Sequence, residues 1–220
     1  MAARHIDDRE GHAHFVTFSC YRRRRLLDHD RAKTIVLGLL GSQLAIQGGR
    51  CVGFVVMPDH VHAIVHFPAP DQLSRFMKPW KQRSSVQVKR FLRAELASYA
   101  GAIDPAEAIW QPRYDDFNLY CPRKVEEMLV SMYLNPVRSG LVARPSDWPW
   151  SSARYYESGR TVGVPVGWLD GRLLSLRDPD NKLSGPPRDT SSSKSWAGTR
   201  SIVPLARVTR SSQLIMWLYG

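Results

Sequence analysis

A short hairpin in the first third of the chain restricts its fold more than any other feature. The apolar run CVGFVVM, residues 51–57, is typical of a central β-strand. The turn Met57-Pro58-Asp59 follows it, and residues 60–66 then read HVHAIVH. Two strands joined by so short a turn pair in antiparallel fashion, so the sequence predicts a sheet built around this hairpin.

The second strand of the hairpin carries histidines at alternate positions. Because side chains alternate between the two faces of a strand, His60 and His62 point the same way, with Cα atoms about 6.5–7 Å apart. Two imidazoles on one rigid face can hold a divalent cation when a third ligand comes from elsewhere. They can equally be ordinary half-buried strand histidines, because His-x-His alone is a weak motif.

The residues before the hairpin predict a strand and a helix. Residues 12–21, HAHFVTFSCY, alternate and are rich in β-branched and aromatic types, as expected of a strand. Asp28 or Asp30 can cap a helix that runs to about Gln47, where two glycines end it. The four arginines between these elements, residues 22–25, are either a solvated loop or a phosphate clamp.

The residues after the hairpin predict helix, strand and helix. A long basic helix is expected from Gln72 to about Ala100, with a possible break at Pro79. A strand is expected within residues 109–120. Another helix should begin at Pro122 and end at Asn135-Pro136, since a residue before proline avoids the helical region.

The order β-α-β-β-α-β predicts an α+β, ferredoxin-like fold: one antiparallel sheet with helices packed on one face. Residues 1–170 are expected to form this domain. Residues 171–220 are rich in Ser, Pro, Gly, Arg and Lys, and are expected to be a basic, largely disordered tail.

The charge indicates a polyanionic partner. The net charge is +11, divided into +6 for residues 1–170 and +5 for residues 171–220, so the excess does not come from the tail alone. Three scattered cysteines, no signal peptide and no apolar run of membrane-spanning length lead us to expect a cytoplasmic protein. The side chains expected to contact DNA are Arg22, Arg23, Arg24, Lys78, Lys81, Arg83, Lys89, Arg113 and Tyr114.

Three further motifs follow the histidine strand in order: WQPRYDDFNLY, YLNPVRSGLV and DWPWSSARYY. Together with the histidine strand they resemble the HUH single-tyrosine transposases, and within them the REP-associated tyrosine transposases. The resemblance extends over roughly residues 12–168.

This resemblance implies a site for Mg²⁺ or Mn²⁺ held by His60, His62 and, as the third ligand, the amide of Asn135. It also implies a single-stranded or hairpin DNA substrate. The protein is expected to act as a monomer or homodimer and to have no membrane partner. In the family a tyrosine attacks the scissile phosphate, which gives a 5′-phosphotyrosine intermediate. On DNA, such a protein is associated with the bacterial nucleoid.

The sequence departs from the family at the nucleophile. The family tyrosine stands four residues before the ligand amide, but Ser131 occupies that position here and the nearest tyrosine is Tyr133. Two residues along a helix amount to roughly 200° of rotation. The side chain of Tyr133 should therefore point away from the side of the helix that holds Ser131 and Asn135.

Several readings follow from this departure. A locally slipped helix would let Tyr133 act, attack by the shorter Ser131 is the second possibility, and loss of cleavage is the third. A catalytically inactive, domesticated DNA-binding protein is therefore the alternative to a transposase. An RNA-binding ferredoxin-like module is less favoured, because no aromatic stacking pair is evident in the strand motifs.

Overall fold

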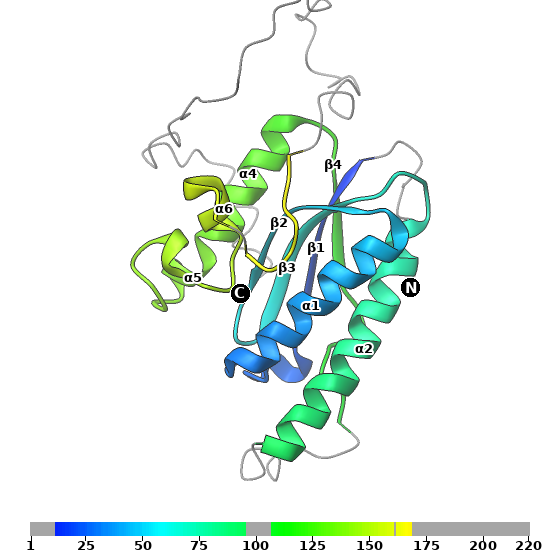
Figure 1. The fold of residues 1–220 in the computed structure, drawn as a ribbon, viewed down its shortest axis with the longest axis vertical. Coiled ribbons are helices and arrows are strands. Elements are labelled where there is room, and N and C mark those ends of the chain that lie inside the picture. The colour runs from blue at the N-terminus through cyan, green and yellow to red at the C-terminus, as the bar shows by residue number, and fades with distance from the viewer. Residues whose placement is uncertain (1–11, 96–106, 161, 169–220) are drawn as a thin grey trace, which may run out of the picture. The chain divides into compact units, whose positions relative to one another are not determined.

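The computed structural model describes residues 12–95, 107–160 and 162–168 (Figure 1). The strands are β1 (Ala13–Ser19), β2 (Arg50–Val56), β3 (His60–His66) and β4 (Asp115–Leu119). The helices are α1 (Asp30–Gln47), α2 (Gln72–Glu95), α4 (Pro122–Tyr133), α5 (Asn135–Arg138) and α6 (Ala153–Ser158), with short 3₁₀ turns η1 (Tyr21–Arg23) and η2 (Pro145–Asp147).

The four strands form one antiparallel sheet in the order β2-β3-β1-β4. The predicted hairpin pairs β2 with β3, and β1 lies between β3 and β4. Across the β1–β3 ladder, Thr17 lies opposite His62 and Ser19 lies opposite His60. The predicted α+β class and ferredoxin-like order of elements are confirmed.

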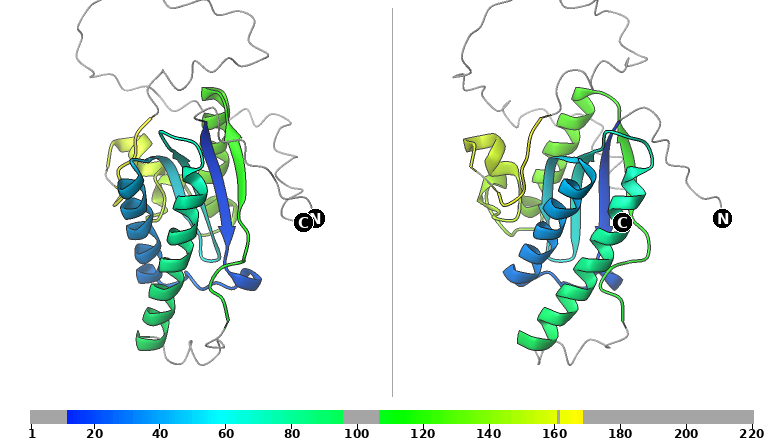
Figure 2. Two further views of the ribbon diagram at one scale, coloured as in Figure 1. Left: turned by 90° about the vertical axis from the view of Figure 1, so that its right-hand side faces the viewer. Right: turned by 45° about the vertical axis from the view of Figure 1, so that its right-hand side comes forward.

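Helices cover both faces of this sheet, not one as predicted. Helices α1 and α2 pack side by side on one face, where Leu40 and Trp80 belong to the same buried cluster as Val61 (Figure 2). Helix α4 packs on the other face, where Leu129 clusters with Ile64. The prediction is wrong in this detail because alternation along a strand does not reveal which helix covers each face.

The two histidines of the hairpin lie on the α4 side of the sheet. Ile64 belongs to the α4 cluster, whereas Val61 and Val65 belong to the cluster beneath α1 and α2. Alternation along β3 therefore places His60 and His62 on the face of Ile64. This face is called the histidine face below.

The ends of α1 have identifiable causes. The side chain of His29 accepts a hydrogen bond from the backbone N–H of Arg31 at 3.2 Å, so His29 caps the helix and the expected caps Asp28 and Asp30 do not. Gly48 ends it in the left-handed region, at φ 63°.

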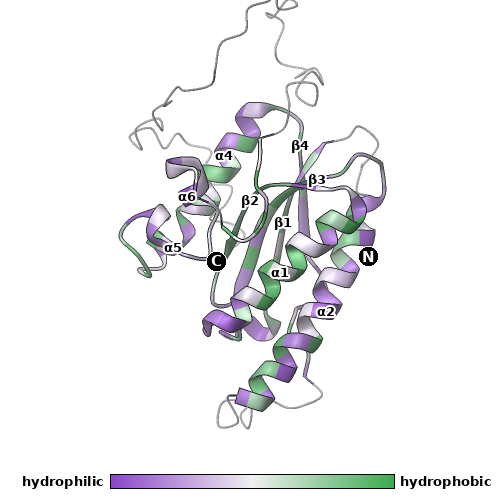
Figure 3. Ribbon diagram, viewed as in Figure 1, coloured by the Kyte–Doolittle hydropathy of each residue, from purple (hydrophilic) through white to green (hydrophobic). Residues whose placement is uncertain are grey.

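Helix α2 continues through Pro79 without ending there. It extends to Glu95, and the rest of the expected helix, residues 96–100, lies outside the described residues. Hydrophobic and hydrophilic stretches alternate along α2, whereas β2 is mainly hydrophobic (Figure 3). One side of α2 is thus buried and the other is available to solvent and charge.

Helix α4 ends at Tyr133, two residues before the predicted limit. Leu134 keeps right-handed helical angles, and α5 follows directly from Asn135. Proline at the second position of α5 is compatible with a helical first turn, which explains why the chain turns once more instead of leaving the helical region.

The Pro- and Trp-rich segment packs along the outer edge of β2. The backbone N–H of Val56 donates to the carbonyl of Trp150 at 2.8 Å, and that of Ser152 donates to the carbonyl of Phe54 at 3.0 Å. The indole N–H of Trp148 donates to the Val56 carbonyl at 3.0 Å. Residues 148–152 therefore occupy hydrogen-bonding groups that an edge strand would leave open.

Lys33 of α1 fixes this segment from the other side. Its amine lies 5.7 Å and 5.6 Å from the ring centroids of Trp148 and Trp150. The side chain is only 3% exposed, and its amine donates to the Asp28 carbonyl at 2.6 Å. A buried ammonium between two indoles ties the segment to the start of α1.

Within the described ranges no helix has the length and apolar character needed to cross a bilayer. The expected basic tail, residues 171–220, lies outside those ranges, as does the proposed boundary at residue 170.

Candidate metal and DNA site

His60 and His62 form a compact pair on the histidine face. Their ring centroids are 4.7 Å apart and their planes meet at 79°. Both residues are buried, at 8% and 2% exposure. The strand thus brings two imidazoles together as the spacing predicted.

Each ring is held through its Nδ1 atom. The Nδ1 of His62 lies 2.7 Å from the hydroxyl oxygen of Thr17, and the Nδ1 of His60 lies 2.6 Å from a carboxylate oxygen of Asp59. A partner at one ring nitrogen fixes the orientation of the ring and leaves the other nitrogen to face a ligand.

The Nε2 atom of His62 is buried and has no hydrogen-bond partner among the described residues. Burial, then the positive charge of His60 and then that of Arg23, hold the pKa of His62 well below its ordinary value. At neutral pH the ring is therefore uncharged, which is the form that binds a metal ion.

Asn135 follows α4, the helix that packs on the histidine face. Its side-chain nitrogen donates to the carbonyls of Met132 at 3.2 Å and Ser131 at 3.5 Å. With the amide nitrogen turned back to the helix, the amide oxygen is the atom suited to a cation.

Tyr133 lies on a different side of α4 from Ser131 and Asn135. Its hydroxyl is 2.8 Å from the Oγ of Ser152, which in turn bonds to the Phe54 backbone of β2. Burial raises the pKa of Tyr133 well above its ordinary value. The phenol is thus a partly buried packing group, in agreement with the rotation expected from its position.

Glycine at position 53 makes this arrangement possible. A Cβ atom at Gly53 would lie 2.8 Å from the Tyr133 hydroxyl oxygen and 2.5 Å from a methyl carbon of Leu129. Both distances are shorter than real Cβ contacts, so any other residue here would force the side chains of Leu129 and Tyr133 to move.

The arginine run reaches the site through one of its members. Arg23 donates to the Ser19 hydroxyl at 2.9 Å and lies 3.6 Å from the Asp59 carboxylate, close to His60. Arg22 and Arg24 pair instead with Glu107. Glu107 therefore holds two members of the run, while Arg23 lies beside the carboxylate that holds His60.

The basic residues of α2 lie on the opposite face of the sheet from the histidines. Lys78 and Arg83 are exposed there, and Lys89 is half-buried. Helix α2 belongs to the layer that covers the other face of the sheet, so its basic side chains do not lie beside the histidine pair.

Lys81 and Tyr114 serve the structure of a loop. The amine of Lys81 donates to the carbonyls of Gln111, Pro112 and Arg113 at 2.8, 3.2 and 3.0 Å. It also lies 5.9 Å from the ring centroid of Tyr114, which packs on the core beneath α2. Burial lowers the pKa of Lys81 to about 8.

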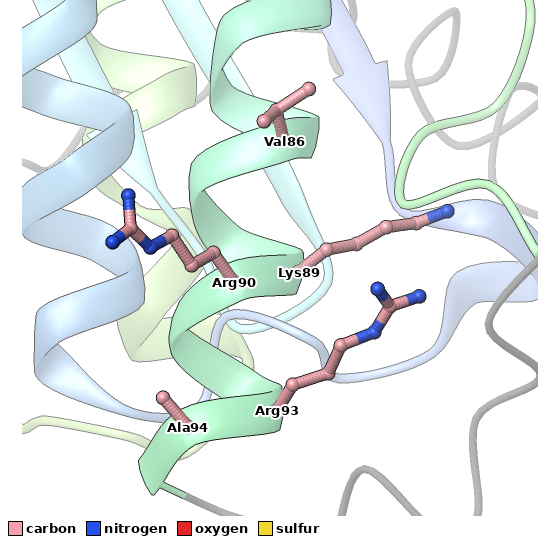
Figure 4. Close-up of a pocket in the computed structure, with 5 residues that line it drawn as sticks. All are labelled: Val86, Lys89, Arg90, Arg93 and Ala94. Atoms are coloured by element: carbon pink, nitrogen blue, oxygen red, sulfur yellow. The ribbon is translucent and has the colours of Figure 1, made fainter.

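A shallow pocket marks the far end of α2 (Figure 4). Lys89 and Arg93 extend to one side of the helix and Arg90 to the other, and Val86 and Ala94 complete the lining one turn before and one turn after (Figure 4). The pocket is thus lined by three basic side chains on one stretch of α2.

Four residues near the histidines had no predicted role: Thr17, Asp59, Phe15 and Phe117. Phe15 stacks on His62, with ring centroids 5.5 Å apart and planes at 16°, and Phe117 lies beside it at 6.3 Å. Phe15 and Thr17 stand two residues apart in the first predicted strand, so the sequence alone could place both side chains on one face of the sheet. The pairing with Phe117 could not be predicted in this way, because it depends on strand register.

The comparisons with known proteins all match transposases. A family model described as transposase IS200 like matches residues 9–134. The REP-associated tyrosine transposase of Escherichia coli (strain K12) is 27% identical over 115 residues, covering 52% of this chain and 59% of that protein. The chain thus spans about three fifths of the length of this curated relative.

Two further matches agree with the first. A putative REP-associated tyrosine transposase of Haemophilus influenzae (strain ATCC 51907 / DSM 11121 / KW20 / Rd) is 24% identical over 138 residues, which is 61% of this chain and 70% of that protein. A solved structure of a REP-associated tyrosine transposase bound to a REP hairpin superposes with a TM-score of 0.57 at 22% identity, over 87% of this chain and all of that chain. At this identity the superposition supports the shared fold.

Proposed function

The chain belongs to the IS200-like transposase family, and from this premise we propose that it binds hairpin or single-stranded DNA at its histidine face. The E. coli and H. influenzae relatives are named as transposases, and the solved relative was captured on a REP hairpin. The net charge of +11 fits a nucleic-acid partner.

The observation that carries the proposal is the orientation of the histidine pair. Thr17 and Asp59 hold the Nδ1 atoms, and the Nε2 of His62 is a buried nitrogen without a hydrogen bond among the described residues. A buried polar atom left in this way costs free energy, about 1–3 kcal/mol, unless a ligand satisfies it. The donor chemistry fits a metal ion.

His60, His62 and the amide oxygen of Asn135 would hold this ion, with Mg²⁺ or Mn²⁺ as the expected metal. When bound, such an ion polarises phosphate oxygens and orients the phosphate. The chain's own contribution is to keep His62 uncharged by burial and to fix both rings before the ion arrives.

We further propose that Tyr133 does not cleave DNA. Support comes from its hydroxyl, which is bonded to Ser152 on the side of α4 away from Ser131, and from its raised pKa. A neutral phenol whose hydroxyl is already hydrogen bonded is a poor nucleophile. The serine at the family tyrosine position has a side chain shorter by a ring. The chain is then a DNA-binding descendant of a transposase rather than a strand-transfer enzyme.

The phosphate contacts are assigned to basic side chains of η1 and α2. Arg22 is largely exposed and Arg23 is partly so. Lys89 and Arg93 extend to one side of α2 (Figure 4). A hairpin stem held here would lead its single-stranded flank onto the histidine face, since Arg23 adjoins both regions.

Metal binding tests the first part of the proposal. Titration calorimetry with Mn²⁺ should show one site in the wild type and none in the double variant His60→Ala, His62→Ala. His66→Ala is the matched control, because His66 lies on the same strand and face but at the opposite end, and it should keep the site. Equal Mn²⁺ binding by the double variant would overturn the metal site.

A covalent-adduct assay tests the second part. Labelled hairpin DNA with single-stranded flanks is incubated with protein and Mn²⁺, denatured and separated on a gel. We expect bound DNA before denaturation and no protein–DNA adduct after it. An adduct that forms with wild type and disappears in Tyr133→Phe would show that Tyr133 is the nucleophile after all.

A further inference from the structure

Two phenylalanines lie side by side on the histidine face. Phe15 of β1 and Phe117 of β4 are direct partners across the ladder, and their ring centroids are 6.3 Å apart at 38°. Phe15 also stacks on the ring of His62. The pair is thus continuous with the proposed metal site and stands on adjacent strands of a rigid sheet.

Packing of α4 does not fully account for this pair. The next pair on the same face of these two strands, Ala13 and Leu119, is 2% and 6% exposed and belongs to the α4 cluster. Phe15 and Phe117 are only half-buried. Both rings therefore keep part of their surface exposed on the β4 side of this face, beside the exposed Asp115, whereas Thr17 and His62 next to them are buried.

Polar groups surround this surface in an ordered way. Along β1 the histidine face presents Phe15, then Thr17 and Ser19, and Arg23 follows just after the strand. The order is an aromatic ring, the histidine pair, and a cation. Exposed Asp115 stands beside Phe117 on the outer strand and would repel a phosphate there, so phosphates are favoured on the Arg23 side.

We propose that Phe15 and Phe117 form a stacking platform for one unpaired base of single-stranded DNA, next to the phosphate at the histidines. This inference rests on the proposed DNA-binding function and adds a base-binding subsite to it. The ligand must be unpaired, because a base within a duplex has both faces stacked already. Stacking on an aromatic ring tolerates any base, so the platform positions the strand without reading sequence.

A fluorescent base locates the subsite. The probe is a synthetic DNA hairpin with a short single-stranded flank, in which 2-aminopurine replaces each flank position in turn. Stacking on an aromatic ring quenches this base, so one position should lose fluorescence on binding. Phe117→Leu keeps an apolar side chain but removes the ring, and should restore the fluorescence. Phe117→Tyr keeps the ring and should retain the quenching.

Affinity supplies the second measurement. Phe117→Leu should bind the flanked hairpin about tenfold more weakly than wild type, and the blunt hairpin equally well. An abasic nucleotide at the quenched position should weaken wild-type binding by a similar factor and have no added effect in Phe117→Leu. Circular dichroism and thermal melting confirm that the variants fold.

The possible outcomes distinguish a failure of the base platform from a failure of the proposed DNA-binding function. If the wild type binds no hairpin DNA, the proposed function fails and this subsite with it. If the wild type binds, but no position is quenched or the leucine variant quenches equally, the base platform alone is overturned. Additive losses from the abasic site and Phe117→Leu would likewise show that ring and base do not meet.

Discussion

The hydroxyl of Tyr133 lies 2.8 Å from the Oγ of Ser152, nineteen residues later in the chain. Ser152 also bonds to both the N–H and the carbonyl of Phe54. One serine therefore links the end of α4, the strand β2 and the Trp-rich segment. Tyr133, the tyrosine nearest to the family's nucleophile position, is therefore part of this structural junction.

Loss of this junction should destabilise the protein. We expect Ser152→Ala to lower the free energy of unfolding by about 1–3 kcal/mol, because it leaves buried polar groups without partners. Urea unfolding followed by circular dichroism measures the change. Ser158→Ala is the control, since its hydroxyl makes one exposed bond to Arg154, and it should shift stability by less than about 0.5 kcal/mol.

The hydroxyl of Thr17 should set the metal affinity. Thr17→Val keeps the shape of the side chain but frees the Nδ1 of His62, and we expect Mn²⁺ affinity to fall roughly 10- to 100-fold. Titration calorimetry measures it. Thr17→Ser retains the hydroxyl and should bind nearly as the wild type does; equal affinity in the valine variant would mean that the hydroxyl does not orient the ring.

Acid should destabilise the metal-free protein through His62. Its pKa is lowered in the folded state, so between that pKa and the unfolded value near 6.5 the unfolded chain binds more protons. The free energy of unfolding should therefore fall as pH drops below about 6.5. Urea titrations at several pH values, with a chelator present, should show a weaker pH dependence for His62→Asn.

Arg23 should contribute a phosphate contact and Lys78 should not. We expect Arg23→Gln to weaken hairpin binding and to reduce the slope of log affinity against log salt by about 0.7–0.9. Lys78→Gln removes an exposed charge from the opposite layer and serves as the matched control. If both variants lower the slope equally, DNA also contacts the α2 face.

Much of the fold follows from local pattern. The alternation of residues 60–66 and the helical spacing before Gln47 correspond to β3 and α1 almost residue for residue. The offset of Tyr133 from Ser131 is likewise a local property of a helix, so its departure from the Asn135 flank could be expected.

What the sequence did not reveal depends on contacts between distant segments. The layer that holds Lys78 and Arg83 is determined by packing, and strand register brings Phe15 opposite Phe117. The role of Lys81 could not be foreseen either, because its three carbonyl partners come from a loop about thirty residues away.

The segment along β2 has a consequence for where this protein can be shortened. The family match ends at residue 134, before Trp148, Trp150 and Ser152. A chain cut there would leave the backbone groups of Phe54 and Val56 open at a buried, hydrophobic edge, and would leave Lys33 without its indoles. Such a fragment should associate through exposed strand edges, so the part matched by the family model should not fold as a unit by itself.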